Sequence, residues 1–226
     1  MDFGWGTPDQ SSHRAADVNA AMQAAVNRVA SLIPGDMLLR LPATVADITI
    51  AETHLGQSLP EDVRALYLLH DGQHRYTAQD PRWAAGLFAE VPLLPLAQVL
   101  AQWDMWDGFE DEPDLDESAT STPDGYVQEK YSTRGWIPLT EDGGGNHIGV
   151  DLNPGPAGTV GQVIMFGRDD EEHRVLAPSL LSYLEQLGDL LEHGHGETTE
   201  GEDGWNLRGS NGYLDHTLFH PAGTTT

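Results

Sequence analysis

The spacing of apolar residues predicts helices in the first half of the chain. Between residues 15 and 33 they recur every three or four positions, as on the buried face of a helix, and Pro34-Gly35 predicts its end. A second helix is expected to follow Thr44, because Thr44 and Asp47 have the spacing of a capping box. Gly56 is expected to end it in a left-handed conformation. Its inward face is expected to hold Val45, Ile48 and Leu55.

Two more helices are predicted before residue 110. Residues 59–62 predict the start of a third helix, because proline tolerates the first turn and two acids suit the positive end of the helix dipole. Asp71-Gly72 predicts its end. Residues 86–91 are expected to form a short strand, and apolar spacing over residues 96–106 predicts a fourth helix.

The second half of the chain has the pattern of short strands in series. Apolar segments of strand length lie at residues 136–139, 147–152, 160–166 and 174–177. Ser179 is expected to cap a last helix. Because short strands in series favour an antiparallel meander, the predicted fold class is α+β, a mostly antiparallel sheet flanked by helices.

These elements predict a single domain over residues 14–194. Residues 1–13 are expected to form a polar arm, and residues 195–226 a tail rich in glycine, threonine and histidine. An acidic insert at about residues 104–130, with ten acids and no base between Asp104 and Glu129, is predicted to be mostly a solvated loop. The aromatic and apolar residues that could dock part of the tail are Trp205, Tyr213, Leu214 and Phe219.

The charge of the chain narrows the kinds of partner it could bind. It carries 36 acidic and 11 basic residues, a net charge of -25. Such a field repels nucleic-acid phosphates and anionic lipids, so neither nucleic acid nor membrane is an expected partner. It favours basic proteins and speeds the encounter with them, although acidity can also serve solubility alone.

Other compositional features exclude several classes of protein. The chain has no cysteine, which excludes disulfides, thiolate metal sites and cysteine nucleophiles. No apolar run reaches the roughly 18–20 residues that a membrane span needs. The N-terminus, Met1 to Trp5, lacks the basic and apolar regions of a signal peptide, so a cytoplasmic location is expected.

A set of short motifs follows in a fixed order along the chain. In residues 52–63 a helix ending in Leu-Gly is followed by Leu-Pro, an acid and a second helix, and Asp71-Gly72 forms a stop after it. The later motifs are residues 136–138, 142–146, 150–154, 161–163 and 179–187. Together they resemble the signature of the SUKH superfamily, the domain of fungal cell-wall synthesis regulators and many bacterial relatives. That family shows an Asn-Gly-like stop at the place of Asp71-Gly72, and the later motifs resemble its central strands and closing helix.

This resemblance covers about residues 36–193 and depends on the order and spacing of the motifs. It implies an α+β domain without enzymatic activity. Bacterial members resemble immunity proteins, which neutralise a toxin by binding it, and fungal members resemble scaffolds in cell-wall signalling. The insert before Trp136 and the tail after Gly194 go beyond the family's minimal pattern.

The acidic insert is the first candidate site. Its acids lie beside Trp103, Trp106 and Phe109. Acids that surround aromatic residues suit an interface with a basic protein, because the aromatics anchor the partner while the acids steer and pair with Lys or Arg. The alternative is a solvated loop with Trp103 in the core. The candidate partner-binding residues here are Trp103, Asp104, Trp106, Asp107, Glu110, Asp111 and Glu112.

The segment of residues 141–146 is the second candidate. Its three glycines could surround an anion, but Glu141 and Asp142 would repel a phosphate, and the spacing does not fit a calcium loop. It is expected to form a tight turn in which Asn146 bonds locally. Asp142 and Asn146 are kept as candidate partner-binding residues.

No cofactor or metal is expected. His193 and His195, or His216 and His220, could gather a divalent ion, but their glycine-rich surroundings argue against a rigid site. Carboxylate pairs are inevitable among 36 acids, so they carry little weight as evidence for a hydrolase, and no nucleophile elbow or Walker-type loop is present.

The sequence therefore predicts a non-enzymatic protein-binding domain. Its first hypothesis is an immunity protein that neutralises a basic toxin, such as a nuclease, by occlusion. Two alternatives stay open: a regulatory scaffold module of the cell-wall-regulator type, and a carboxylate-based hydrolase.

Overall fold

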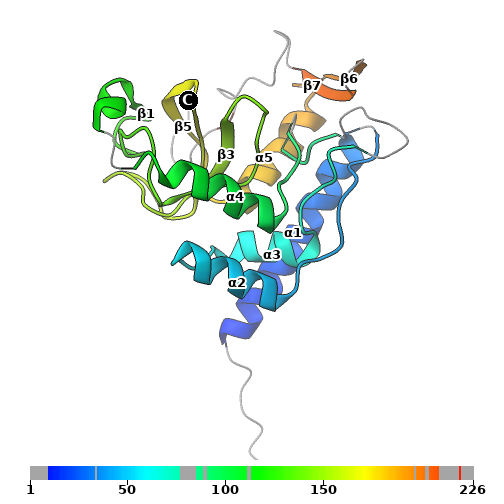
Figure 1. Ribbon diagram of the computed structural model, residues 1–226. Coiled ribbons are helices and arrows are strands. Elements are labelled where there is room, and N and C mark those ends of the chain that lie inside the picture. The colour runs from blue at the N-terminus through cyan, green and yellow to red at the C-terminus, as the bar shows by residue number, and fades with distance from the viewer. Residues whose placement is uncertain are drawn as a thin grey trace, which may run out of the picture.

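The computed structural model of the chain describes residues 10–33, 35–76, 85–88, 91–110, 113–195, 197–201, 204–208 and 219. Its elements are a set of helices packed around one mixed sheet, with a separate two-stranded hairpin near the C-terminus (Figure 1). The predicted α+β class is confirmed. No helix among these residues is both long enough and apolar enough to cross a bilayer.

The helices lie close to where apolar spacing predicts them. They are α1 (Gln10–Leu32), α2 (Val45–Leu55), α3 (Glu61–Leu69), α4 (Leu96–Asp107) and α5 (Leu180–Glu192). Helix α1 begins at Gln10, inside the range expected to be a polar arm, because polar residues of its first turns extend the helix beyond its buried stripe.

Capping residues set the ends of α2. Thr44 accepts a hydrogen bond from the backbone N–H of Asp47, and the Asp47 carboxylate accepts one from the backbone N–H of Thr44. Gly56 follows the helix in a left-handed conformation with φ of 67°. The capping box and the glycine stop are confirmed. Val45 was expected to face inward and is instead exposed, because Ile48, Ala51 and Leu55 form the buried face.

The sheet contains the predicted meander. Strands β2 (Trp136–Pro138), β3 (Asn146–Asp151), β4 (Gln162–Gly167) and β5 (Asp170–Ala177) pair antiparallel in sequence order. A further strand, β1 (Thr120–Thr122), pairs parallel with β5 and completes the order β1-β5-β4-β3-β2. Strand β1 was missed because its three residues have no apolar alternation.

The short strand predicted at residues 86–91 is wrong. Phe88 and Val91 pair with each other in an isolated antiparallel bridge with hydrogen bonds in both directions, which two residues of one extended strand could not do. Gly86 permits this, because a Cβ on it would lie 2.4 Å from the backbone of Val91.

The acidic insert is more ordered than predicted. It contains a short 3-10 helix, η1 (Pro113–Ser118), and strand β1, and Ala119 and Val127 are buried. The expectation of an irregular loop is therefore wrong for η1 and β1, whereas residues 123–130 form turns and bends, as a loop does. The apolar residues of the segment are too widely spaced to show a helical or strand period. One of them, Val127, nevertheless packs against the sheet.

Alternating residues of the strands build a core on each face of the sheet. On one face Ile137, Val150 and Val163 join the helices in the main core. On the other face Trp136, Ile164, Phe166 and Val175 pack with Val127 in a smaller core. Figure 1 shows α5 and α1 side by side on the main-core side, and α4 packs against β2, the strand at the edge of the sheet.

Part of the C-terminal tail is tied to the domain. Strands β6 (Glu197–Gly201) and β7 (Gly204–Arg208) form the hairpin, and the buried Phe219 stacks on Tyr183 of α5 with ring centroids 4.8 Å apart. The docking predicted for Phe219 is confirmed. Tyr213 and Leu214 lie outside the described residues, and only the backbone of Trp205 is described.

Replacing Phe219 tests whether the tail stabilises the domain. We expect Phe219→Ala to lower the free energy of unfolding by about 3 kcal/mol, because it removes a buried ring from the main core. Urea unfolding followed by circular dichroism measures the change. The matched control is Val160→Ala, at an exposed position, which should change stability by less than about 0.5 kcal/mol. Equal stability of the two variants would contradict a stabilising role for the tail.

Candidate protein-binding surface

The acids predicted to bind a partner cluster at the C-terminal end of α4. Asp104 Oδ1 lies 2.7 Å from His54 Nε2 of α2. Asp107 forms an ion pair with Arg134, and Glu110 Oε2 lies 3.1 Å from Arg134 Nε. The structure therefore brings Asp104, Asp107 and Glu110 to one region and holds each with a neighbouring basic group. Asp111 and Glu112 lie outside the described residues.

The two tryptophans of this region are not exposed anchors. Trp103 and Trp106 are only 8% and 7% exposed. Both continue the inward face that begins at Leu96 and Val99, so helical spacing places them against the domain. The Trp103 indole N–H donates to the carbonyl of Arg134 at 3.0 Å. The predicted anchoring role of Trp103 and Trp106 is therefore corrected: both rings are buried against the domain, where they position α4.

Three other apolar side chains are exposed among the acids. Met105, Phe109 and Leu115 are 52%, 39% and 39% exposed. Phe109 contacts the ring of Tyr131, whose backbone N–H donates to Asp116 of η1 at 2.7 Å, so η1 lies beside the end of α4. We call this surface the acidic corner. Its residues are Asp104, Met105, Asp107, Phe109, Glu110, Asp114, Leu115 and Glu117.

Sequence reasoning missed Met105 and Leu115 as exposed residues, whereas Phe109 is one of the aromatics that it grouped with the acids. Met105 occupies a position on α4 opposite Trp103 and Trp106, which a helical projection of the sequence can show. Phe109 and Leu115 follow the helix, where no periodic pattern assigns a face.

A buried hydrogen bond fixes the acidic corner to the sheet. Trp106 Nε1 donates to His147 Nε2 of β3 at 2.8 Å. His147 Nδ1 lies 2.6 Å from the carbonyl of Thr140, and because a carbonyl only accepts, Nδ1 carries the proton. Burial lowers the pKa of His147 below its usual value, opposed by its bond to Thr140 and the charges of Glu141 and Asp142. The ring is therefore neutral at pH 7, and the indole N–H requires that state.

A second histidine holds the other end of the acidic segment. His173 Nε2 of β5 donates to the carbonyl of Lys130 at 2.7 Å, and its ring meets Trp136 edge-on at 4.7 Å. Burial lowers the pKa of His173 as well. Residues 106–130 are thus attached to the sheet at both ends by neutral, buried imidazoles.

The segment of residues 141–146 forms the tight turn that the sequence predicts. Asp142 Oδ1 accepts from the backbone N–H groups of Gly144 and Asn146 at 2.6 and 3.0 Å, and Asn146 Nδ2 donates to Asp142 Oδ2. Partial burial opposes ionisation, but the hydrogen bonds from Asn146 and Gly144 lower the pKa of Asp142. Asp142 and Asn146 thus form these hydrogen bonds within their own turn. That they also bind a partner stays a prediction.

The described residues offer little for catalysis or metal binding. No group of three or more His, Asp or Glu side chains among them could hold a metal ion. Burial raises the pKa of Asp151 to about 6, but this carboxylate is fully buried and accepts from Asn153 N and Gln162 Nε2. A substrate could not reach Asp151, so this carboxylate gives no support to the hydrolase alternative.

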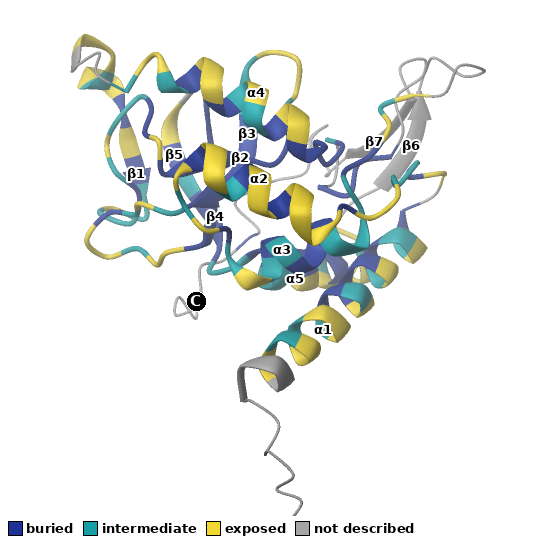
Figure 2. Cartoon of the chain, turned by 60° about the horizontal axis from the view of Figure 1, so that its bottom comes forward, coloured by how far each residue is buried: buried dark blue, intermediate teal, exposed yellow. Residues whose placement is uncertain are grey.

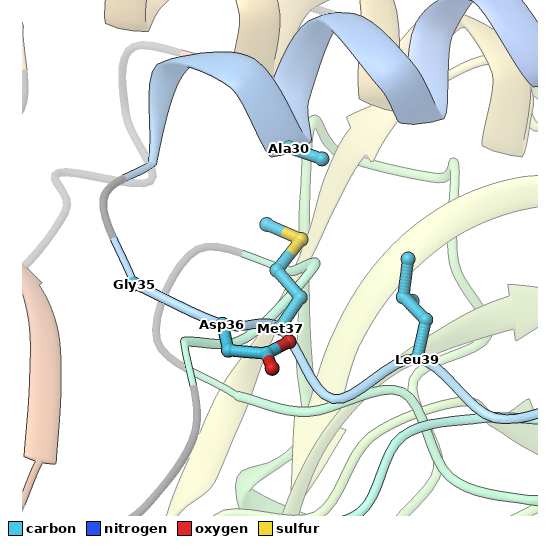
Figure 3. Close-up of a pocket in the computed structure, with 5 residues that line it drawn as sticks. All are labelled: Ala30, Gly35, Asp36, Met37 and Leu39. Carbon is cyan, nitrogen blue, oxygen red and sulfur yellow. The ribbon is translucent and has the colours of Figure 1, made fainter.

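A pocket of about 570 Å³ lies between the end of α1 and the segment that leads to α2 (Figure 3). Ala30, Met37 and Leu39 supply its apolar side chains, and Asp36 is its ionisable group. The Asp36 carboxylate accepts from the backbone N–H of Leu38 at 2.8 Å, which caps the local turn. Among the described residues, the lining thus combines one engaged carboxylate with apolar groups, which is not a catalytic constellation.

Comparison with known proteins gives a consistent assignment. The family model described as SMI1 / KNR4 family (SUKH-1) matches residues 42–186. The chain is 37% identical to the cell wall biosynthesis/cell cycle regulator smi1 of Schizosaccharomyces pombe, over 67% of this chain and 31% of that protein. It is 33% identical to the cell wall assembly regulator SMI1 of Saccharomyces cerevisiae, over 68% of this chain and 36% of that protein.

A third relative is the glucan synthesis regulatory protein of Neurospora crassa, 29% identical over 73% of this chain and 36% of that protein. The chain thus spans about a third of the length of these relatives. All three are named as regulators, which favours the regulatory-scaffold alternative over the immunity protein that the sequence analysis placed first.

The neutral state of His147 predicts how stability responds to acid. A histidine whose folded pKa is lowered stabilises the fold above its unfolded pKa of about 6.5, and this contribution is lost as the pH falls below that value. We expect wild type to lose more unfolding free energy between pH 7.5 and 5 than His147→Gln, which keeps an acceptor for Trp106 but does not titrate. His74→Gln, at an exposed site, should behave as wild type. An identical pH dependence of wild type and His147→Gln, measured by urea unfolding, would contradict the prediction.

Proposed function

Because this chain belongs to the SMI1 / KNR4 family (SUKH-1), we propose that it is a regulatory scaffold domain that binds other proteins in the control of cell-wall assembly. Its relatives are named as regulators of cell-wall biosynthesis, cell-wall assembly and glucan synthesis. These names describe proteins about three times the length of the match, so the process is transferred to this chain as a proposal.

The observation that carries the proposal is the composition of the acidic corner. Met105, Phe109 and Leu115 expose apolar groups among carboxylates. The helix that leads to them, α4, is held against the domain by its buried tryptophans. Apolar anchors surrounded by charges of one sign fit a partner with the opposite charge. In a chain with a net charge of -25, the complementary partner is a protein with a basic surface.

Arg134 illustrates how this surface receives a guanidinium group. Its side chain contacts both Asp107 and Glu110, and its backbone N–H donates to Glu110 Oε1 at 3.2 Å. These contacts hold two carboxylates in fixed positions next to Phe109. The exposed acids Asp114 and Glu117 then supply charge for the basic groups of a partner.

The immunity hypothesis would use the same surface and differs in the number and strength of partners. An immunity protein binds one toxin tightly, in a one-to-one complex, whereas a scaffold binds several proteins more weakly. Since the relatives are named as regulators, we propose the scaffold. The names of the relatives are also consistent with the expectation that this domain is not an enzyme.

A charge-reversal experiment tests the proposal. Asp114→Lys with Glu117→Lys reverses two exposed charges without touching the Arg134 ion pairs. The matched control, Asp17→Lys with Glu185→Lys, makes the same charge change on exposed positions of α1 and α5. Proteins that co-purify with the tagged chain from its source cells would be identified, and the affinity of each would be measured at two salt concentrations.

We expect several basic proteins to bind wild type and the control at least about tenfold more tightly than the corner variant, with affinity falling as salt rises. Source cells that lack the gene should show altered wall-polymer content. If the partner proteins bound the corner variant and the control with equal affinity, the interface would have to lie on another surface. If the chain bound a single basic toxin with nanomolar affinity, the immunity hypothesis would be favoured over the scaffold hypothesis.

A further inference from the structure

The outer face of α2 carries exposed apolar residues that do not belong to the core of the domain. Val45 and Ile50 are 60% and 64% exposed, and Ala46, Thr49 and Thr53 are exposed beside them. The α2 stripe, as we call these five residues, carries no charge in a chain with a net charge of -25. Figure 2 shows exposed residues along the outer sides of α2 and α4.

The two threonines add to the apolar character of the α2 stripe. Thr49 Oγ1 donates to the carbonyl of Val45 at 2.9 Å, and Thr53 Oγ1 donates to the carbonyl of Thr49 at 2.7 Å. Their hydroxyl protons are thus used within the helix. A contacting surface would meet their methyl groups without having to satisfy a hydroxyl donor.

The choice of residues points to a contact outside this chain. Val45, Thr49, Ile50 and Thr53 are β-branched, and such residues form helices less readily than Ala, Glu or Lys. At exposed positions they recover nothing by packing within the domain. Their stiff side chains lose little freedom when another surface covers them, which suits an interface.

The shape of this face fits a second helix. Val45, Thr49 and Thr53 form a ridge of residues four apart, and Ala46, Ile50 and His54 form the next ridge, so a groove runs between them. On one side His54 meets Asp104 of the neighbouring α4. On the other side a hollow of about 270 Å³ opens beside the stripe and could receive one side chain. It is lined by Thr49, Glu52, Thr53, Gly56, Gln57 and Ser58.

We propose that the α2 stripe docks an amphipathic helix of a partner protein, with its apolar side against the stripe and Lys or Arg residues on its flanks. The assignment depends on the proposed function, that the chain binds proteins, but uses a different surface from the acidic corner. Charge complementarity selects the occupant. Two exposed acids lie along the His54 edge of the stripe: Asp47 of α2 and Asp104, where the acidic corner adjoins it. The hydrogen bonds from Thr44 lower the pKa of Asp47, so it is ionised at pH 7. A second copy of the chain, with its own net charge of -25, would be repelled.

A model peptide tests the docking directly. The probe is a fluorescent 18-residue peptide of leucine and lysine with the leucines at helical spacing, and its control is a scrambled peptide of the same composition. Binding is followed by fluorescence anisotropy at 0.15 M salt. The chain variants are Ile50→Glu and, as a second substitution on the stripe, Val45→Glu. Both positions are exposed and glutamate is a better helix former, so both variants should fold, as circular dichroism would verify.

Glutamate separates docking from simple charge attraction, because it adds an acid while removing an apolar contact. We expect the helical peptide to bind wild type more tightly than the scrambled one, and Ile50→Glu and Val45→Glu each to weaken binding at least about tenfold. Val160→Glu, which changes an equally exposed valine away from α2, should bind as wild type. Unchanged or tighter binding to Ile50→Glu, or equal binding of the two peptides, would overturn the proposal.

Two further measurements distinguish this inference from the proposed function. The corner variant Asp114→Lys with Glu117→Lys should keep its preference for the helical over the scrambled peptide. If that preference is lost there and kept in Ile50→Glu, the acidic corner binds the peptide and the α2 stripe does not. Analytical ultracentrifugation should show wild type as a monomer. Self-association that Ile50→Glu abolishes would assign the stripe to a second copy and overturn the inference.

Discussion

The hydrogen bond from the Trp106 indole to neutral His147 is the contact on which the candidate surface depends. It joins the end of α4 to β3 and brings the Trp106 ring against Phe109, Tyr131 and Phe166. The hydroxyl of Ser132 donates to the Trp106 carbonyl at 3.0 Å, so the returning chain is fastened to the same residue. Because both polar atoms are buried, losing either partner would leave the other unsatisfied, which typically costs about 1–3 kcal/mol. The exposed residues of the acidic corner are therefore displayed from a rigid base.

The sequence predicts most of the fold because the helices and the central strands are periodic. Thr44 with Asp47, and Gly56, set the limits of α2 through local chemistry that a linear sequence contains. Strand β1 could not be predicted in the same way, since it depends on a parallel pairing with β5 some fifty residues away. For the candidate site, the acids of the sequence indicate a region, but the exposed role predicted for Trp106 is contradicted by the burial of this residue. Its indole N–H has a buried acceptor only because folding brings His147 to it.

Two different surfaces meet on the α2 and α4 side of the domain. The acidic corner attracts basic groups over a distance, and the α2 stripe offers apolar contact with little loss of freedom on binding. His54 and Asp104 lie where the two surfaces adjoin. A scaffold that used both could hold basic partners of different shapes, as expected for a domain whose relatives are named as regulators.

Hydrogen–deuterium exchange of the full chain, with and without a partner recovered from its source cells, tests the central claim most directly. The account predicts that binding slows exchange in α4 and in residues 113–131, which hold the exposed acids and apolar groups of the acidic corner. Exchange in the turn of residues 153–161, on the connection between β3 and β4, should stay unchanged. Slowed exchange confined to that turn, with α4 unaffected, would contradict the claim that the acidic corner is the binding surface.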